Sequence, residues 1–147
     1  MMNLDQQVQA LLQDAPDDPE MRQITRIFIP VLKSLAAKRR HLQYYVLQTE
    51  SGEWVRLSLI NRTQSNREKT VIYAFSTIED AKMSIEPGQD IPCNPVPVAV
   101  IDLLFKFFAF NLGESLVFFE KPGDRLKGVE VPRSEFEDAL YGSSDLA

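Results

Sequence analysis

The stretch PVPVAVIDLLFKFFAFNL, residues 95–112, is the part of the sequence that decides the fold. It is almost continuously apolar, and after the prolines only Asp102 and Lys106 interrupt it before the final asparagine. A helix of this composition needs apolar surface around most of its circumference. We therefore predict that residues 98–112 form a hydrophobic helix, which is the centre of the fold, a contact surface for another chain, or both.

Phenylalanines are concentrated on this predicted helix, at Phe105, Phe107, Phe108 and Phe110. Their spacing directs the rings to more than one side of the helix, whereas a single sheet covers only one side. The excess apolar surface predicts a second packing partner, which is either another helix of this chain or another subunit. These four phenylalanines are therefore the candidate interaction residues.

Polar residues in and after the segment fit a helix. Asp102 and Lys106 are four residues apart, so their side chains share one face and can form an ion pair. Gly113 follows the segment directly, at the position where a glycine commonly ends a helix in the left-handed conformation.

The length of 147 residues fits a single domain that buries a core without metal or disulfide support. With 44% hydrophobic and 25% charged residues, the composition is typical of a soluble globular protein. We expect one domain over residues 1–142 and a flexible tail over residues 143–147.

Two helices are predicted before the first strand. Residues 4–12 show the hydrophobic spacing of a short amphipathic helix. A second helix begins with Asp17 or Asp18 as its cap and runs to about Arg39. Because Pro30 lies inside it, we expect a kink there.

From His41 onward the hydrophobic period changes to two. This alternation predicts an antiparallel hairpin of strands 42–46 and 55–59 around a turn at residues 50–53. Residues 61–69 are polar throughout and predict a mobile loop.

The second half of the chain alternates between strands and helices. Ser76 with Glu79 and Ser134 with Glu137 form capping-box patterns that open helices. In order we expect a central strand 71–75, a helix 78–84, a proline-rich loop 86–95, the hydrophobic helix, strands 116–119 and 126–131, and a last helix 134–142. Blocks of this kind predict an α+β fold with a mainly antiparallel sheet of about five strands packed against helices.

Charge argues against nucleic acid as a partner. The net charge is −5 and the isoelectric point is near 4.9, whereas phosphate binding needs clustered positive charge. Basic residues gather at 38–40, where they complement the dipole at the end of the predicted second helix. Others gather at Arg62, Arg67 and Lys69 within the polar loop.

The sequence carries no recognisable catalytic, cofactor or metal motif. Cys93 is the only cysteine and His41 the only histidine, so neither a disulfide nor a zinc site of nitrogen and sulfur ligands is expected. The hydrophobic segment is too short for a confident membrane span, and the N-terminus lacks the pattern of a signal peptide. We therefore expect a cytoplasmic protein without a transmembrane segment.

The sequence resembles the N-terminal domain of the enhanced-serine-sensitivity B (SseB) family. In that family a strand leads into F-[ST]-x-x-E-x-A, which residues 75–81 match as FSTIEDA. The segment LDQQVQALLQDAPDDPEMRQITRIFIPVL matches its helical start, and KPG at residues 121–123 replaces its Asn-Pro-Gly. The resemblance implies an α+β interaction or accessory module, with no active site that transfers to this chain.

Our leading hypothesis is a non-enzymatic interaction domain that docks another protein, or itself, through the phenylalanine-rich helix. An alternative is a small-ligand binder or enzyme with a pocket between this helix and the sheet. Its polar and stacking groups would be Tyr44, Tyr45, Trp54 and Arg56. Attachment to a membrane surface is a third class.

Overall fold

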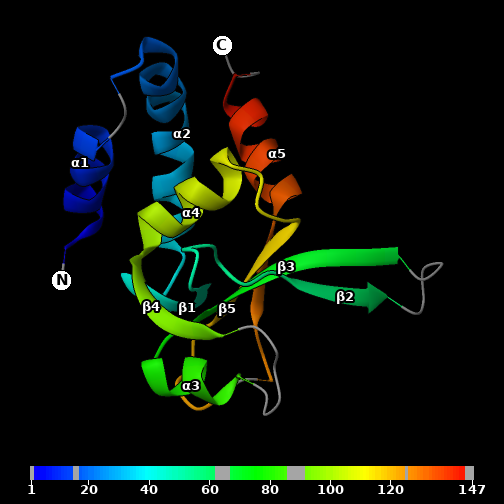
Figure 1. Cartoon of the computed structure of the whole chain (residues 1–147). Helices are drawn as coiled ribbons and strands as arrows, with labels where there is room; N and C mark the ends of the chain where they lie inside the picture. Colours follow the sequence, from blue (N-terminus) through cyan, green and yellow to red (C-terminus); the bar gives the residue numbers. More distant parts are fainter. Residues whose placement is uncertain (1, 15–16, 62–66, 86–91, 125, 145–147) are drawn as a thin grey trace.

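The computed structural model describes residues 2–14, 17–61, 67–85, 92–124 and 126–144. Within these residues the chain forms five helices and an open, mixed six-stranded sheet (Figure 1). The predicted α+β class is therefore confirmed. In chain order the elements are α1 (Leu4–Asp14), α2 (Pro19–Ala37), β1 (Gln43–Thr49), β2 (Leu57–Asn61), β3 (Arg67–Phe75), α3 (Ile78–Met83), β4 (Cys93–Ala99), α4 (Val100–Ala109), β5 (Ser115–Phe119), β6 (Val129–Pro132) and α5 (Arg133–Ser144).

The sheet has the strand order β4-β1-β3-β5-β6, with β2 paired to β3 beside this path. Every pair is antiparallel except β3–β5, which is parallel. The predicted mainly antiparallel sheet is thus correct in outline, and β3 is central as expected. The parallel pair arises because α3, β4 and α4 separate β3 from β5, and a crossover of this length allows parallel pairing.

The predicted hairpin of strands 42–46 and 55–59 is wrong over most of its length. Only its turn-proximal end forms, where Val55 donates its N–H to the Leu47 carbonyl at 2.8 Å. The chain then leaves β1, and β2 pairs with the first half of β3 in a two-stranded ribbon that extends away from the body (Figure 1). Residues 67–69 of the predicted polar loop therefore belong to a strand, and residues 62–66 lie outside the described residues.

Strand β4 was not predicted, because its prolines indicate a loop. It pairs with β1 along its whole length, at the edge of the sheet. Val100 donates its N–H to the Leu42 carbonyl at 2.9 Å. In this register the backbone N–H and C=O groups of the even-numbered residues of β4 point toward β1, and those of the odd-numbered residues point away from it. The missing N–H groups of Pro95 and Pro97 consequently face the free edge, where proline is tolerated. The predicted helix 98–112 is shorter as a result, and residues 86–91 of the predicted loop lie outside the described residues.

The ends of α4 differ from the prediction. At its start, the side-chain oxygen of Gln7 accepts the N–H of Ile101 at 3.0 Å and so caps the helix from a distant segment. At its end, Asn111 adopts the left-handed conformation with φ of 53°, a role that we predicted for Gly113. Position 113 is crowded instead, because a Cβ there would lie 3.1 Å from the Thr70 carbonyl oxygen and that neighbour would have to shift slightly.

Other helix boundaries are close to those expected. Asp18 caps α2, which continues through Pro30 and ends at Ala37. Thr77 rather than Ser76 caps α3.

The last elements are shifted relative to the prediction. Strand β6 begins at Val129 rather than at residue 126, and α5 begins one residue before the predicted start. Helix α5 also includes residues 143–144 of the predicted tail, whereas residues 145–147 lie outside the described residues.

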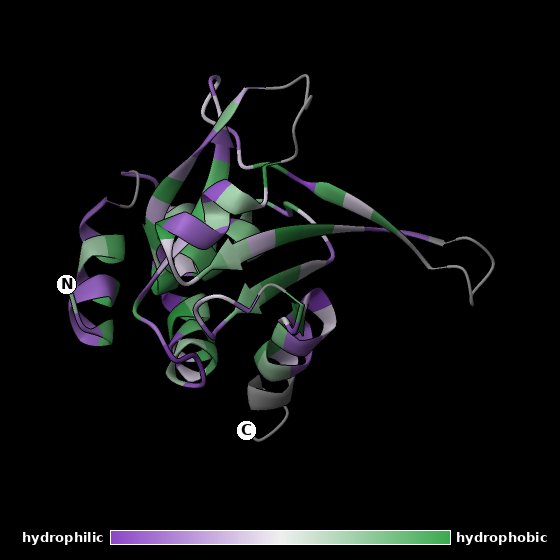
Figure 2. Cartoon of the chain, turned by 90° about the horizontal axis from the view of Figure 1, so that it is seen from below, coloured by the Kyte–Doolittle hydropathy of each residue, from purple (hydrophilic) through white to green (hydrophobic). Residues whose placement is uncertain are grey.

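The core lies mainly on one face of the sheet, which we call the helix face. Helices α1, α2, α4 and α5 cover it, whereas α3 covers the opposite face, the α3 face (Figure 1). Hydrophobic residues concentrate on the strands and on the inner sides of the helices (Figure 2). The largest fully buried side chains of the helix face are Leu32, Tyr44, Val46, Ile72, Ile101, Leu103, Leu104, Phe107, Leu116 and Phe118.

Candidate binding site at the end of α4

The four candidate interaction phenylalanines divide into three buried rings and one exposed ring. Phe105, Phe107 and Phe108 are 7%, 0% and 3% exposed, whereas Phe110 is 57% exposed. Phe108 stacks on Phe136 of α5 at a centroid distance of 4.2 Å. The fold of this chain therefore buries the three rings, and no second subunit is needed to do so. Phe110, at the C-terminal end of α4, is the part of this set that a partner can reach.

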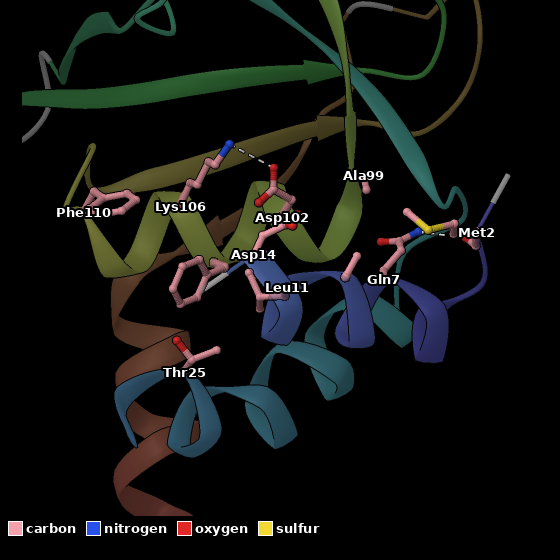
Figure 3. Close-up of a pocket in the computed structure, with 11 residues that line it drawn as sticks. Met2, Gln7, Leu11, Asp14, Thr25, Ala99, Asp102, Lys106 and Phe110 are labelled. Atoms are coloured by element: carbon pink, nitrogen blue, oxygen red, sulfur yellow. Dashed lines mark hydrogen bonds and ion pairs between the residues drawn. The ribbon is translucent and has the colours of Figure 1, made fainter. Parts of the chain in front are cut away.

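A hollow of about 430 Å³ lies between α1, α2 and α4, beside Phe110. We call it the helical hollow, and Figure 3 shows the side chains that surround it. They are Met2, Gln7, Ala10, Leu11, Asp14, Thr25, Ala99, Asp102, Phe105, Lys106 and Phe110.

The buried polar groups of the helical hollow are already used within the chain. The amide nitrogen of Gln7 donates to the carbonyls of Met2 at 2.9 Å and Leu42 at 3.0 Å. The Thr25 hydroxyl donates to the Met21 carbonyl at 2.7 Å. These groups stabilise the fold and are not free to bind a ligand.

Charged groups line the helical hollow on α1 and α4. The predicted ion pair of Asp102 and Lys106 is confirmed, with 3.1 Å between a carboxylate oxygen and Nζ (Figure 3). Asp14 adds a second carboxylate from the last turn of α1. The helical hollow is thus mainly apolar. Its charged residues are two acids and one lysine, and the lysine is paired with one of the acids.

A second hollow, of about 330 Å³, lies between α4 and the sheet, and Lys106 and Phe110 line it as well as the first. We call it the sheet hollow. It brings Trp54 and Arg56, two of the four residues of the predicted alternative pocket, together with the end of α4. Its lining residues are Gln48, Gly52, Glu53, Trp54, Arg56, Ile72, Lys106, Phe110 and Leu112.

The other two residues of the predicted pocket, Tyr44 and Tyr45, lie elsewhere. Tyr44 is fully buried in the helix-face core, and its hydroxyl donates to a carboxylate oxygen of Glu120. Burial, and then the hydrogen bond to Glu120, raise the pKa of Tyr44 above its ordinary value. Tyr45 packs against the buried cluster on the α3 face. Neighbouring strand residues point to opposite faces, so they could not both line one pocket.

Glu120 organises a buried polar cluster that sequence reasoning missed. Its carboxylate accepts a hydrogen bond from the backbone N–H of Arg40 at 3.0 Å and lies 4.0 Å from the Arg39 guanidinium. Its carbonyl lies 2.7 Å from Nε2 of His41. The cluster joins the segment after α2 to the end of β5. Of the basic residues that we assigned to a helix terminus, Arg39 therefore has its side chain beside a distant acid, and Arg40 contributes its backbone N–H. No spacing in the sequence indicates this pairing.

Cys93 and His41 are not brought together. Cys93 pairs with Thr49 at one end of β1, whereas His41 precedes the other end. At 3.4 Å per residue, a strand of this length separates them by roughly 20 Å. A Cys–His catalytic pair is therefore excluded for this arrangement.

Comparisons with known proteins add no assignment: no family model and no curated protein matches the chain. Across the described ranges, no group of three or more His, Cys, Asp or Glu side chains is placed to hold a metal ion. In the same ranges no helix is both long and apolar enough to cross a membrane.

Proposed function

We propose that this chain is a non-enzymatic interaction domain that binds a second copy of itself through the end of α4. The observation that supports this most strongly is Phe110, which is 57% exposed on a helix whose other phenylalanines are buried. An exposed aromatic ring beside an apolar hollow is typical of an interface anchor and its pocket.

A second copy is favoured over an unrelated partner because the surface is self-complementary. A twofold contact places the same patch on both subunits, so each patch must offer both a protruding group and a cavity. Here Phe110 protrudes beside the helical hollow, which it also lines.

Light scattering of the purified chain at micromolar concentrations tests this proposal. We expect a dimer, and Phe110→Glu should give a monomer because a carboxylate would be buried at the centre of the contact. The matched control is Ile27→Glu on α2, since Ile27 is similarly exposed at 52% and lines neither hollow. The control should remain dimeric. A wild-type chain that is monomeric throughout this range contradicts self-association.

Native mass spectrometry of the chain purified from its own cells tests the broader docking function. A stoichiometric protein partner that is lost on Phe110→Glu and kept on Ile27→Glu would retain the docking surface with a different occupant. A chain that carries no protein partner and stays monomeric contradicts the interaction function as a whole.

We also propose that the domain is cytoplasmic. The resemblance of residues 75–81 to the SseB motif supports a role as an accessory module. A second candidate function is small-ligand binding in the sheet hollow. It is favoured by the convergence of Trp54, Arg56 and Lys106 on one cavity.

A further inference from the structure

We infer that the sheet hollow binds a planar anion, meaning an aromatic or heteroaromatic ring that carries one carboxylate or phosphate group. This inference names the ligand class for the second candidate function. It does not depend on self-association, although Phe110 and Lys106 line both hollows.

Two aromatic rings from different elements supply stacking surface. Trp54 lies in the segment between β1 and β2, residues 50–56, which we call the strap. Phe110 lies at the end of α4. Ile72 and Leu112 add apolar wall on the same side of the sheet. Aromatic side chains stack favourably on planar groups and contribute more than their buried area alone.

The strap is held in place before any ligand arrives. Trp54 forms a backbone bridge with Gln48. On either side of this bridge, the backbone N–H of Thr49 donates to the Glu53 carbonyl at 2.8 Å, and the backbone N–H of Val55 donates to the Leu47 carbonyl at 2.8 Å. A backbone segment that is already ordered loses little conformational freedom on binding, which favours affinity.

The charges of the sheet hollow favour an anion. Arg56 is exposed and has no hydrogen-bond or ion-pair partner among the described residues. Lys106 adds a second cation, which lies 6.0 Å from the centre of the Trp54 ring and is shared with Asp102. Glu53 is the one acid among the lining residues. An exposed guanidinium offers a planar fork that matches a carboxylate or phosphate.

The volume limits the ligand to a small one. At about 330 Å³ the sheet hollow lies at the lower end of the range for small-molecule sites. It therefore fits a single ring system with one acidic group better than an extended ligand. Because the chain has a net charge of −5, anions have little general attraction to it, and binding must come from this local pair of cations.

Trp54 provides the test, since it is the only tryptophan in the sequence. Its fluorescence, excited at a wavelength where the probes do not absorb, is titrated with two matched pairs of probes. Nicotinate with nicotinamide tests a carboxylate, and adenosine monophosphate with adenosine tests a phosphate. We expect saturable quenching in which the anion of at least one pair binds about tenfold or more tightly than its neutral counterpart, as for a charged hydrogen bond.

Arg56→Gln should weaken binding of the anion by about tenfold and leave the neutral probe unchanged. The matched control is Arg22→Gln, because Arg22 lies on α2, pairs with Asp17 and lines neither hollow. It should bind like the wild type, and far-ultraviolet circular dichroism should show that both variants are folded.

Equal affinity for charged and neutral probes, absence of saturable quenching, or an unchanged affinity in Arg56→Gln would each overturn the inference. None of these results bears on the oligomeric state, which light scattering measures separately.

Discussion

The two faces of the sheet are covered to very different extents. On the helix face, buried side chains from β1, β3, β4, β5 and β6 meet four helices in one continuous core. On the α3 face, the buried cluster within the described residues consists of Phe75, Ala81 and Phe119, flanked by half-buried residues. The difference indicates that the helix face supplies most of the stability and that the α3 face tolerates change. Both hollows lie on the helix side, and Phe110 at the end of α4 lines both of them.

Truncating one large ring on each face tests this difference in stability most directly. Phe107→Ala should lower the free energy of unfolding by about 3–5 kcal/mol, because the ring is fully buried among helices and strands. Phe119→Ala should cost about 3 kcal/mol or less, because the thinner layer around it can relax into the space. Denaturant unfolding monitored by circular dichroism measures both values. An equal or larger loss for Phe119→Ala would refute the ranking of the two faces.

Removing the caps of α4 and α3 tests the same difference between the two faces, with smaller expected losses of stability. Gln7→Ala should cost about 1–3 kcal/mol, because it leaves the buried N–H of Ile101 and carbonyl of Leu42 without their side-chain partner. Thr77→Ala removes a local cap from α3 and should cost about 1 kcal/mol. The same unfolding measurement applies, with Gln9→Ala on the exposed side of α1 as the control. A loss at Gln7 no greater than at Gln9 would show that α4 does not need this cap.

Alkaline pH should act selectively on the helix face. The raised pKa of Tyr44 means that the folded state favours the neutral hydroxyl. Its contribution to stability is complete below the ordinary pKa of about 10 and is lost as the pH rises toward the folded-state value. Unfolding measured between neutral pH and pH above 10 should therefore show a steeper decline for the wild type than for Tyr44→Phe. Tyr45→Phe, from the other face, should decline like the wild type, and a shared slope for all three chains would count against this assignment.

Local patterns in the sequence predicted much of the fold. Hydrophobic spacing placed α1 and α2, and the aspartate before Pro19 capped α2 as expected. The central position of β3 also agreed with the prediction. These features depend on residues close together in the chain, which is why sequence reasoning reaches them.

The parts that could not be predicted depend on partners far away in the sequence. Pro95 and Pro97 indicate a loop until the free edge of the sheet is known. The cap supplied by Gln7 spans 94 residues, and Glu120 meets Tyr44 across 76. Of the four residues of the predicted pocket, Trp54 and Arg56 line the sheet hollow beside α4, whereas Tyr44 and Tyr45 lie elsewhere. Because side chains alternate between the two faces along β1, Tyr44 and Tyr45 cannot both line one pocket. This argument needs only the sequence and could have been applied before the structure was known.

The prolines of β4 have one more consequence. An additional strand that approached this side would find two donors missing at consecutive outward positions, so stable pairing there is blocked. Growth of the sheet by strand addition, whether into a larger assembly or into a fibrillar aggregate, is therefore closed off along β4.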